Sequence, residues 1–330
     1  MSIYSATSMN HRWLALATAA VLAVLPSLAK DKKKDPAEIG NRDVGKGVNF
    51  YSIEKEIAMG KQLAIEVTRQ AKMVDDPIVG EFVNRLGQNL ARNSDTTIPV
   101  SFQIIDDDSV NGFTLPGGYV FINSGLIRLA ETEAELAGAV AHEIAHVAAR
   151  HGTRQQTRAE IVNLASIPLI FLGGWTGYAV RQGANVGIPL GFLTFSRAFE
   201  NEADLLGIQY MYKAGYDPTA SIDIFERIES LEKRKPGAVA KIFSSHPMTG
   251  DRISRAQQNI NQILPEKPEY VVNTSEYNQI HERMIAIHRR TKREPADPGR
   301  PTLQRAPGGW KTTETGRDDR PVLKRLDEEL

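Results

Sequence analysis

Apolar residues recur at three- and four-residue spacing between Ile53 and Asn93. This period is typical of a helix that buries one face. The pattern is interrupted at Asp76-Pro77. It therefore predicts two amphipathic helices, and we expect both to pack on a core formed by later residues.

Two short segments further on have the composition of β-strands. They are Ser101–Ile105 (SFQII) and Gly118–Ile122 (GYVFI), and Asn111-Gly112 and Pro116-Gly117-Gly118 provide turn residues between them. This predicts a small sheet. Helical patterns then dominate from Leu126 to Leu264. We therefore expect a mainly helical α+β fold.

The N-terminus has the pattern of an export signal. Trp13–Leu25 is an uninterrupted apolar run that follows Arg12 and is closed by small residues. This predicts a signal peptide over residues 1–29, cleaved after Ala29. The run is too short to cross about 30 Å of hydrocarbon at about 1.5 Å per residue, so a permanent anchor is the alternative. We expect an exported protein of the periplasm or cell envelope.

The other boundaries follow from composition. Residues 30–50 are polar, Lys-rich and punctuated by Gly and Pro, which is typical of a linker. Residues 51–265 form the main domain, and residues 266–290 form a C-terminal extension with a helix over Ser275–His288. Residues 291–330 are rich in Pro, Gly and charge, so we expect a disordered tail.

The segment Ile161–Val180 is apolar but is interrupted by Pro168 and by three glycines. Its length is close to that needed to span a bilayer. A buried core segment, a lid or membrane-touching hairpin, and a membrane span are all compatible with this pattern. Buried core is the simplest of the three, and peripheral membrane contact is the second.

Composition limits the chemistry. The chain has 330 residues, with 40 Lys+Arg against 40 Asp+Glu, so it lacks the excess of positive charge that a nucleic-acid partner requires. It contains no Cys, which excludes disulfides, thiolate metal sites and a Cys nucleophile. Any metal must therefore be held by His and carboxylate side chains.

A motif for metal chemistry lies in one predicted helix. The capping pattern at Thr132 opens an Ala-rich run that we expect to continue to His151, with Gly152 placed to stop it. Inside it, His142-Glu143-Ile144-Ala145-His146 places two imidazoles four residues apart on one face, where both can bind one zinc ion. Glu143, about 100° around the helix, reaches the attacking water as a base. The simpler alternative is a structural helix with two hydrogen-bonded histidines.

A third ligand has to come from elsewhere. Ala149 and Gly152 do not fit the metzincin pattern HExxHxxGxxH, so we expect a Glu from another helix. Glu200 and Asp204 are four residues apart and share a face, whereas Glu202 points away from that face. We assign Glu200 as the ligand and Asp204 as the carboxylate that orients a ligating imidazole. Glu202 is expected to be solvated or locally paired.

Three further residues carry weaker signals. His246 precedes Pro247 outside a helical pattern, and a loop histidine there could hydrogen-bond the reaction's oxyanion, block the open metal position as a gate, or simply lie on the surface. Arg252 is expected to pair with Asp204 rather than to stabilise transition-state charge. His151 is expected to interact with the helix C-terminus and not to bind metal.

These residues together resemble a known family. HEIAH, the later SRAFENEAD, His246-Pro247 with Arg252 downstream, and NGFTLPGGYVFINSGL upstream are similar to the HtpX-like and prenyl-protein (CAAX type 1) endopeptidases, zinc metallopeptidases of family M48. The resemblance spans roughly residues 53 to 263. It implies a zincin-like (gluzincin) domain with a small sheet over the HExxH helix. It also implies one Zn²⁺ per chain on His142, His146 and Glu200, with Glu143 as the catalytic base.

The predicted function is therefore a zinc-dependent endopeptidase that hydrolyses peptide bonds of exported, misfolded or envelope proteins. Glu143 is the expected base and His246 a second catalytic candidate. We expect the polypeptide substrate to add as a strand along an edge formed by Gly118–Ile122. The alternative is a chaperone-like quality-control module that binds unfolded envelope proteins in the same groove and cuts rarely. The sequence does not indicate an oligomeric state.

Overall fold

The computed structural model describes residues 32–170, 195–234, 246 and 250–293. The predicted signal peptide, part of the segment Ile161–Val180 and nearly all of the predicted tail lie outside these residues. The chain divides into two units, residues 1–288 and residues 289–330, and the contacts below lie within the first. Across the described ranges, the structure has no helix with both the length and the apolarity to cross a bilayer.

In the described part of the chain, helices precede and follow a single small sheet. In chain order they are two 3₁₀ turns, η1 (Lys32–Lys34) and η2 (Pro36–Glu38), then α2 (Ile53–Gln70), α3 (Pro77–Arg92), β1 (Ser101–Ile105), β2 (Gly112–Leu115), β3 (Tyr119–Asn123), α4 (Ser124–Leu129), α5 (Glu133–Ala148), α6 (His151–Ile170), α8 (Arg197–Ala214), α9 (Ala220–Arg234), α10 (Gly250–Ile263) and α11 (Ser275–Arg293). The predicted mainly helical α+β fold is confirmed, as is the pair of helices before the sheet.

The sheet has the strand order β1-β3-β2, which places β3 in the centre. β1 runs parallel to β3, with Ser101 opposite Tyr119, and β2 runs antiparallel to it, with Gly112 opposite Ile122. The expectation that Gly118–Ile122 offers an edge to a further strand is therefore wrong, because both of its sides are already paired. Among the described strands, β2 is paired on one side only.

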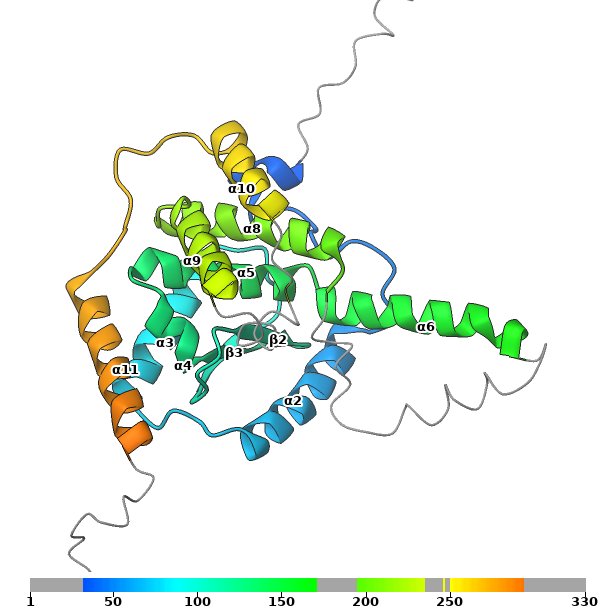
Figure 1. Ribbon diagram of the computed structural model, residues 1–330. Helices are drawn as coiled ribbons and strands as arrows, with labels where there is room; N and C mark the ends of the chain where they lie inside the picture. The colour runs from blue at the N-terminus through cyan, green and yellow to red at the C-terminus, as the bar shows by residue number, and fades with distance from the viewer. Residues whose placement is uncertain (1–31, 171–194, 235–245, 247–249, 294–330) are drawn as a thin grey trace, which may run out of the picture. The chain divides into compact units, whose positions relative to one another are not determined.

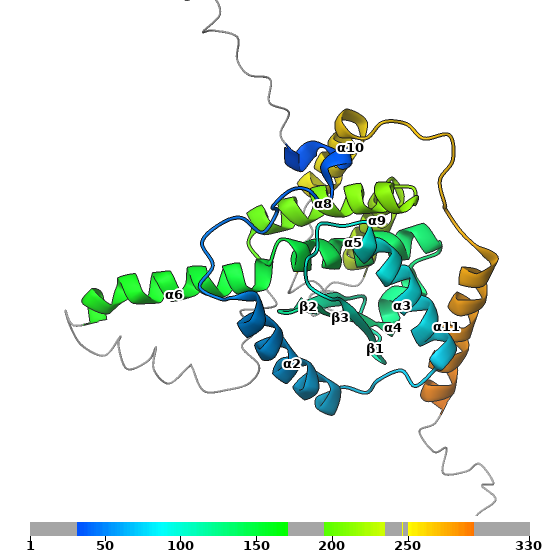
Figure 2. The same ribbon diagram turned by 180° about the vertical axis from the view of Figure 1, so that it is seen from behind.

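The HExxH helix α5 lies between α8 and the sheet, and α2 covers the opposite face of the sheet (Figures 1 and 2). Successive side chains of β3 point to opposite faces of the sheet, so that one face packs on α5 and the other on α2. Val120 and Ile122 belong to the main hydrophobic core with α5. Phe121, between them, packs in a smaller cluster with Ala64 and Val67 of α2.

α5 is buried along almost its whole length, and only Ala139 is partly exposed. It begins as predicted: Thr132 Oγ1 accepts a hydrogen bond from Glu135 N at 3.2 Å. Small residues let α8 come close, since a Cβ added at Gly207 would lie 3.2 Å from the backbone nitrogen of His142. This close approach brings the first turn of α8 beside the HExxH motif.

The end of α5 differs from the prediction. The helix does not continue to His151 with Gly152 as its stop; α6 begins at His151, and Gly152 lies in its first turn. The chain bends at Arg150, whose φ of 54° is left-handed and unfavourable for a residue with a Cβ. Contacts from other elements hold this bend. Arg150 Nε donates to Glu56 Oε2 at 2.8 Å and Nη2 donates to the carbonyl oxygen of Tyr51 at 2.7 Å.

Residues 32–50, which we call the N-terminal arm, pack on the domain and do not form a detached linker. The Arg42 side chain is buried, and its Nε donates to Asp95 Oδ2 at 2.9 Å. Its Nη1 donates to Gln209 Oε1 on α8 at 2.8 Å, and Ile39 is part of the hydrophobic core. The linker prediction is wrong for these residues. Their polar composition suggested solvent exposure, whereas Arg42 forms a buried ion pair with Asp95.

The predicted C-terminal helix is present as α11, and it completes the core. Tyr277 is fully buried, and its hydroxyl donates to the carbonyl oxygen of Ala130 at 2.7 Å. Its ring lies 5.9 Å from that of Phe82 on α3. Ile280 and Met284 are also buried there. The extension is therefore an integral part of the folded unit.

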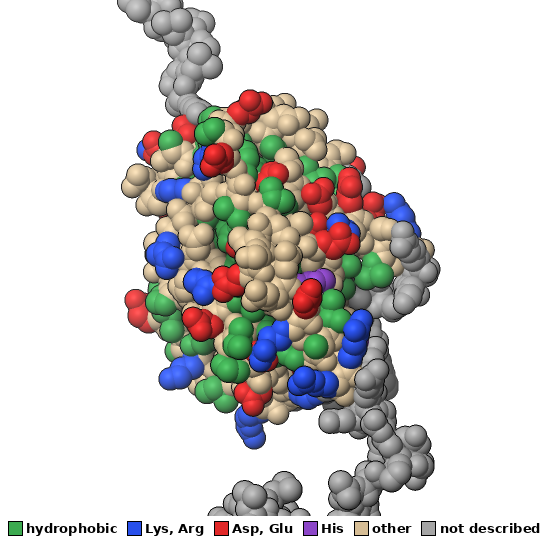
Figure 3. Space-filling view, turned by 90° about the vertical axis from the view of Figure 1, so that its left-hand side faces the viewer, with side chains coloured by type: hydrophobic (Ala, Val, Ile, Leu, Met, Phe, Trp, Pro, Cys, Tyr) green, Lys and Arg blue, Asp and Glu red, His purple; other side chains and the backbone are tan. Residues whose placement is uncertain are grey.

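Charged side chains pair between elements on the surface. Arg283 Nε of α11 lies 2.8 Å from Asp76 Oδ2 at the start of α3. Arg128 Nη2 lies 2.8 Å from Asp108 Oδ1. Figure 3 shows acidic and basic side chains intermixed over one face of the molecule. Exposed pairs of this kind contribute little to stability, about 0–1 kcal/mol each.

Candidate metal centre

Two histidines of α5 lie one helical turn apart and direct their rings to the same place. The Nε2 atoms of His142 and His146 are 3.1 Å apart. Both side chains are buried, as α5 lies beneath α8. The four-residue spacing therefore produces the pair of imidazoles that it predicted.

The first turn of α8 brings a carboxylate to this pair. Ser196 caps the helix, and Glu200 lies one turn further on. Glu200 Oε2 is 3.4 Å from His142 Nε2, and its Oε1 is 3.6 Å from His146 Nε2. The structure therefore brings together the three side chains that we expected to be ligands.

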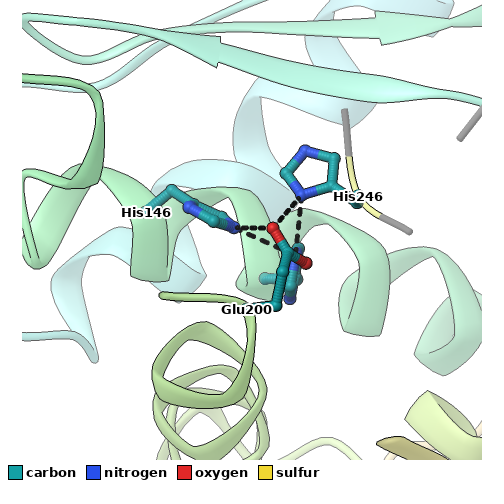
Figure 4. Close-up of side chains that lie close together, drawn as sticks. His146, Glu200 and His246 are labelled. Carbon is teal, nitrogen blue, oxygen red and sulfur yellow. Dashed lines mark hydrogen bonds and ion pairs between the residues drawn. The ribbon is translucent and has the colours of Figure 1, made fainter. Parts of the chain in front are cut away.

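His246 joins this group from a distant part of the chain. Its Nδ1 lies 2.9 Å from Glu200 Oε1 and 3.3 Å from His142 Nε2. Figure 4 shows His146, Glu200 and His246 directed toward one another. His246 is buried, which excludes an ordinary surface position. One donor atom from each of the four residues lies within 4.8 Å of all the others.

The spacing of these atoms fits a zinc ion. Zinc takes His nitrogen and carboxylate oxygen at about 2.0–2.2 Å in a tetrahedron, so neighbouring donor atoms lie about 3.3–3.6 Å apart. The donor contacts given above run from 2.9 Å to 3.6 Å. Two imidazoles and one carboxylate are also a donor set of hydrolytic zinc sites. His142, His146 and Glu200 would hold the ion, and His246 is placed as a fourth donor.

Glu143 lies beside this donor cluster and is not part of it. Thr114 on β2 donates a hydrogen bond from Oγ1 to Glu143 Oε2 at 2.8 Å. The other carboxylate oxygen, Oε1, lies 3.4 Å from His246 Nε2. Sequence reasoning missed Thr114. Its only signal is its place two residues after Asn111-Gly112, in a stretch where the sequence predicted no strand and the structure has β2.

Asp204 and Arg252 support the ligands from behind. Asp204 Oδ1 lies 3.1 Å from His142 Nδ1, as expected for a carboxylate that orients a ligating imidazole. Arg252 donates to both Asp204 oxygens, at 2.8 and 2.7 Å, and its Nη1 lies 3.1 Å from Glu200 Oε2. The structure therefore shows Arg252 in the buried ion pair that we favoured.

Burial and charge have opposite effects on the two α5 histidines. Burial lowers the pKa of His142, but Asp204 and Glu200 outweigh it and raise that pKa to about 9. Burial also lowers the pKa of His146, and there it prevails, so the pKa lies well below its usual value. Without a metal, the raised pKa favours the protonated form of His142 and the lowered pKa favours the neutral form of His146. Burial would raise the pKa of Glu200, but the imidazole of His246 and its neighbours hold it well below the usual range.

His151 is not the helix-end partner that we expected. The bend at Arg150 turns its buried ring back onto the metal cluster, where its Nδ1 lies 3.0 Å from His146 Nδ1. Its Nε2 lies 3.2 Å from Glu202 Oε2. Burial is the main cause that lowers the pKa of His151 to about 4. Glu202 points away from the metal face as predicted, but its partners are distant in the sequence; one is Lys33, with Nζ 2.6 Å from Oε1.

A pocket opens beside Glu143 and His142. Apolar residues of the β1–β2 connection, α4, α5 and α9 form much of its walls, and His246 and Arg252 also line it. These apolar residues are Val110, Leu126, Ala139, Phe225 and Ile228. A substrate side chain that enters here would lie directly beside the residues of the metal centre.

Sequence comparison finds similarity to known peptidases. The model of peptidase family M48 matches residues 79–260. The beta-barrel assembly-enhancing protease of Yersinia pestis is 31% identical over 239 residues, which are 70% of this chain and 49% of that protein. Its counterpart in Escherichia coli K12 is 32% identical over 68% of this chain and 47% of that protein.

A mitochondrial protein is similar over a shorter stretch. The mitochondrial metalloendopeptidase OMA1 of Schizosaccharomyces pombe is 36% identical over 159 residues, which are 47% of this chain and 45% of that protein. The chain thus spans about half the length of the curated relatives that it matches. The matched family region contains the HExxH helix, Glu200, His246 and Arg252.

Proposed function

The chain belongs to peptidase family M48, and from this premise we propose that it is a zinc-dependent endopeptidase that hydrolyses peptide bonds of exported proteins. One observation carries the proposal. His142, His146, Glu200 and His246 place four donor atoms within 4.8 Å of one another, and the carboxylate of Glu143 lies beside them. Two His ligands, one Glu ligand and a separate Glu base are the groups that HExxH zinc peptidases use for metal-assisted hydrolysis.

Zinc held by His142, His146 and Glu200 would supply a Lewis acid that polarises a peptide carbonyl and makes water a better nucleophile near pH 7. Glu143 accepts the proton of the attacking water and returns it to the leaving amine. Thr114 fixes one carboxylate oxygen of Glu143 and so limits rotation of the group. The surrounding burial keeps bulk solvent from competing with these contacts.

We assign to His246 the role of a gate. Three protein ligands leave the single open position that a catalytic zinc site needs. His246 Nδ1 lies 2.9 Å from Glu200 Oε1, among the donor atoms of the proposed ligands. A fourth nitrogen bound there would hold the enzyme inactive until the histidine moves away. A hydrogen bond to the oxyanion is the competing role.

The substrate we propose is an extended segment of an unfolded polypeptide. β2 is the strand beside Glu143, and it is paired on one side only among the described strands. A peptide that adds along β2 would pass the metal centre, and its backbone would pair with the strand. The apolar pocket lined by Leu126, Phe225 and Ile228 would then receive an apolar side chain.

We further propose that the protein acts in the periplasm or cell envelope. The predicted signal peptide supports export. The name of the Yersinia pestis relative refers to the assembly of β-barrels, and transmembrane β-barrels belong to outer membranes. Misfolded or incompletely assembled envelope proteins are therefore the proposed substrates. The apolar sequence Ile161–Val180 is proposed as a peripheral contact with the membrane.

A second candidate function follows from the position of His246. If this residue holds the site closed most of the time, the protein would bind unfolded envelope proteins as a chaperone-like module and cut them rarely. The buried position of His246 within the donor cluster supports this alternative. The two functions differ in turnover and not in where they bind.

Incubation of the mature chain, from residue 30, with casein separates them. A peptidase cleaves casein, loses this activity in a zinc chelator and regains it when zinc is returned. A binding module retains casein or a misfolded envelope protein equally well with and without chelator and releases no fragments. Chelator-insensitive cleavage would contradict the metal-dependent mechanism.

A further inference from the structure

Beyond the ligands and the base, the structure contains a series of hydrogen-bonded side chains that leads away from His146. Its members come from three elements: His151 starts α6, Glu202 lies on α8 and Lys33 lies in the N-terminal arm. His146 Nδ1 lies 3.0 Å from His151 Nδ1, His151 Nε2 lies 3.2 Å from Glu202 Oε2, and Glu202 Oε1 lies 2.6 Å from Lys33 Nζ.

When His146 binds a metal, only one arrangement of hydrogens is possible along this series of hydrogen-bonded side chains. When Nε2 of His146 binds a metal, its Nδ1 carries the hydrogen and must donate it. The Nδ1 of His151 therefore has to accept, which places the hydrogen of His151 on Nε2. That Nε2–H then donates to the carboxylate of Glu202. A doubly protonated His151 would set two N–H groups against each other at 3.0 Å.

Aromatic rings stack on the two histidines of this hydrogen-bonded series. Phe195 stacks on the His146 ring with centroids 4.1 Å apart, and Phe199 stacks on the His151 ring at 4.3 Å. His151 is fully buried. Water is thus kept from the His146–His151 contact, and a polar contact away from water is costly to break. The rings also limit rotation of both imidazoles.

We propose that His151 and Glu202 are positioning residues for the metal ligand His146. They hold its tautomer and ring orientation in the way that Asp204 holds His142 on the other side of the site. The proposal rests on the proposed zinc binding but not on proteolysis. It also gives the N-terminal arm a connection to the metal centre, because Lys33, together with Arg154 of α6, neutralises the carboxylate of Glu202.

The test is the zinc affinity of each variant, measured by competition with a chelator of known affinity. His151→Phe keeps a ring beside Phe199 and removes both nitrogens, and we expect it to weaken zinc binding about 10–100-fold. In His151→Asn the side-chain oxygen occupies the place of Nδ1 and can still accept from His146, so its affinity is expected to lie much closer to wild type. Glu202→Ala should weaken binding more than Glu202→Gln, which retains an acceptor for His151.

Two measurements separate positioning from general damage. The variant His281→Phe makes the same change on α11, away from the metal cluster, and should leave zinc affinity unchanged. The visible spectrum of the cobalt-substituted protein reports ligand geometry, and it should change in His151→Phe but not in His281→Phe. Circular dichroism of the metal-free proteins identifies any variant that fails to fold, and Glu202→Ala then serves in place of His151→Phe.

The outcomes are distinct from those that test the proposed function. A wild-type chain that binds no zinc contradicts the proposed function itself. Tight zinc binding by wild type with unchanged affinity in folded His151→Phe and Glu202→Ala would overturn the positioning role. Equal losses in His151→Phe and His151→Asn would also overturn it, because they would show that the ring's packing and not its hydrogen bond matters.

Discussion

Thr114 on β2 donates a hydrogen bond of 2.8 Å to the carboxylate of Glu143 on α5. The contact ties the strand that we propose binds substrate to the proposed catalytic base. If a peptide adds along β2 as proposed, its binding and the orientation of Glu143 would be linked through this hydroxyl group.

Thr114→Val keeps the shape of this side chain and removes its hydroxyl. Hydrogen bonds to charged groups contribute about 1.5–3 kcal/mol, and loss of even about 1.4 kcal/mol from the transition state lowers the rate tenfold. We expect kcat on a peptide substrate to fall about tenfold with zinc content unchanged. The matched control is Thr157→Val, a buried threonine on α6 whose hydroxyl oxygen accepts from the backbone nitrogen of Phe50 and does not contact Glu143. Unchanged kcat in Thr114→Val would show that Glu143 needs no such support.

Removal of the carboxylate ligand should affect zinc more than removal of the outer carboxylate. Glu200 lies 3.4 and 3.6 Å from the Nε2 atoms of the two α5 histidines, whereas Glu202 reaches the site only through His151. Glu200→Ala is expected to weaken zinc binding by more than about 100-fold, beyond the 10–100-fold range of outer partners. The zinc content of Glu200→Ala and of Glu202→Ala, after dialysis against graded chelator concentrations, measures the two effects. Equal retention by the two variants would contradict the ligand assignment.

His246→Ala tests the gate. If His246 blocks the open metal position, the variant keeps its zinc and cleaves casein faster than wild type. If His246 instead stabilises the oxyanion, the same variant loses about 10²–10³-fold in turnover with zinc still bound. A loss of that size contradicts gating, and so does an unchanged rate.

Zinc uptake should release a proton near pH 7. In the metal-free protein Asp204 and Glu200 outweigh burial and raise the pKa of His142 to about 9, so its ring is protonated at pH 7. A ligating imidazole is neutral, so zinc has to displace this proton. Zinc affinity is therefore expected to rise with pH up to about 9, by roughly tenfold per pH unit. Calorimetric titrations in buffers of different ionisation enthalpy count the protons, and a count of zero would contradict the raised pKa.

The parts of the site that the sequence predicted are those set by local helix geometry. Thr132 fixes where α5 begins, and the four-residue spacing puts His142 and His146 on one face. The same spacing put Glu200 and Asp204 on the face of α8 that meets α5. Each of these relationships depends only on residue spacing within a single helix.

The parts that sequence reasoning missed depend on contacts between distant segments. His151 reaches His146 because the backbone bends at Arg150, and Glu56 and Tyr51 hold that bend from outside the helix. A continuous helix would have turned His151 away. The central place of β3 likewise depends on parallel pairing with β1, which the turns on either side of β2 do not specify.

The most direct test of the central claim is a paired measurement on Glu143→Gln. The amide keeps the size of the side chain and can still accept from Thr114, but it cannot take a proton from water. We expect one zinc per chain by elemental analysis, as in wild type, together with loss of casein cleavage. A variant that holds one zinc and cleaves casein at the wild-type rate would contradict the assignment of Glu143 as the base, and with it the proposed mechanism.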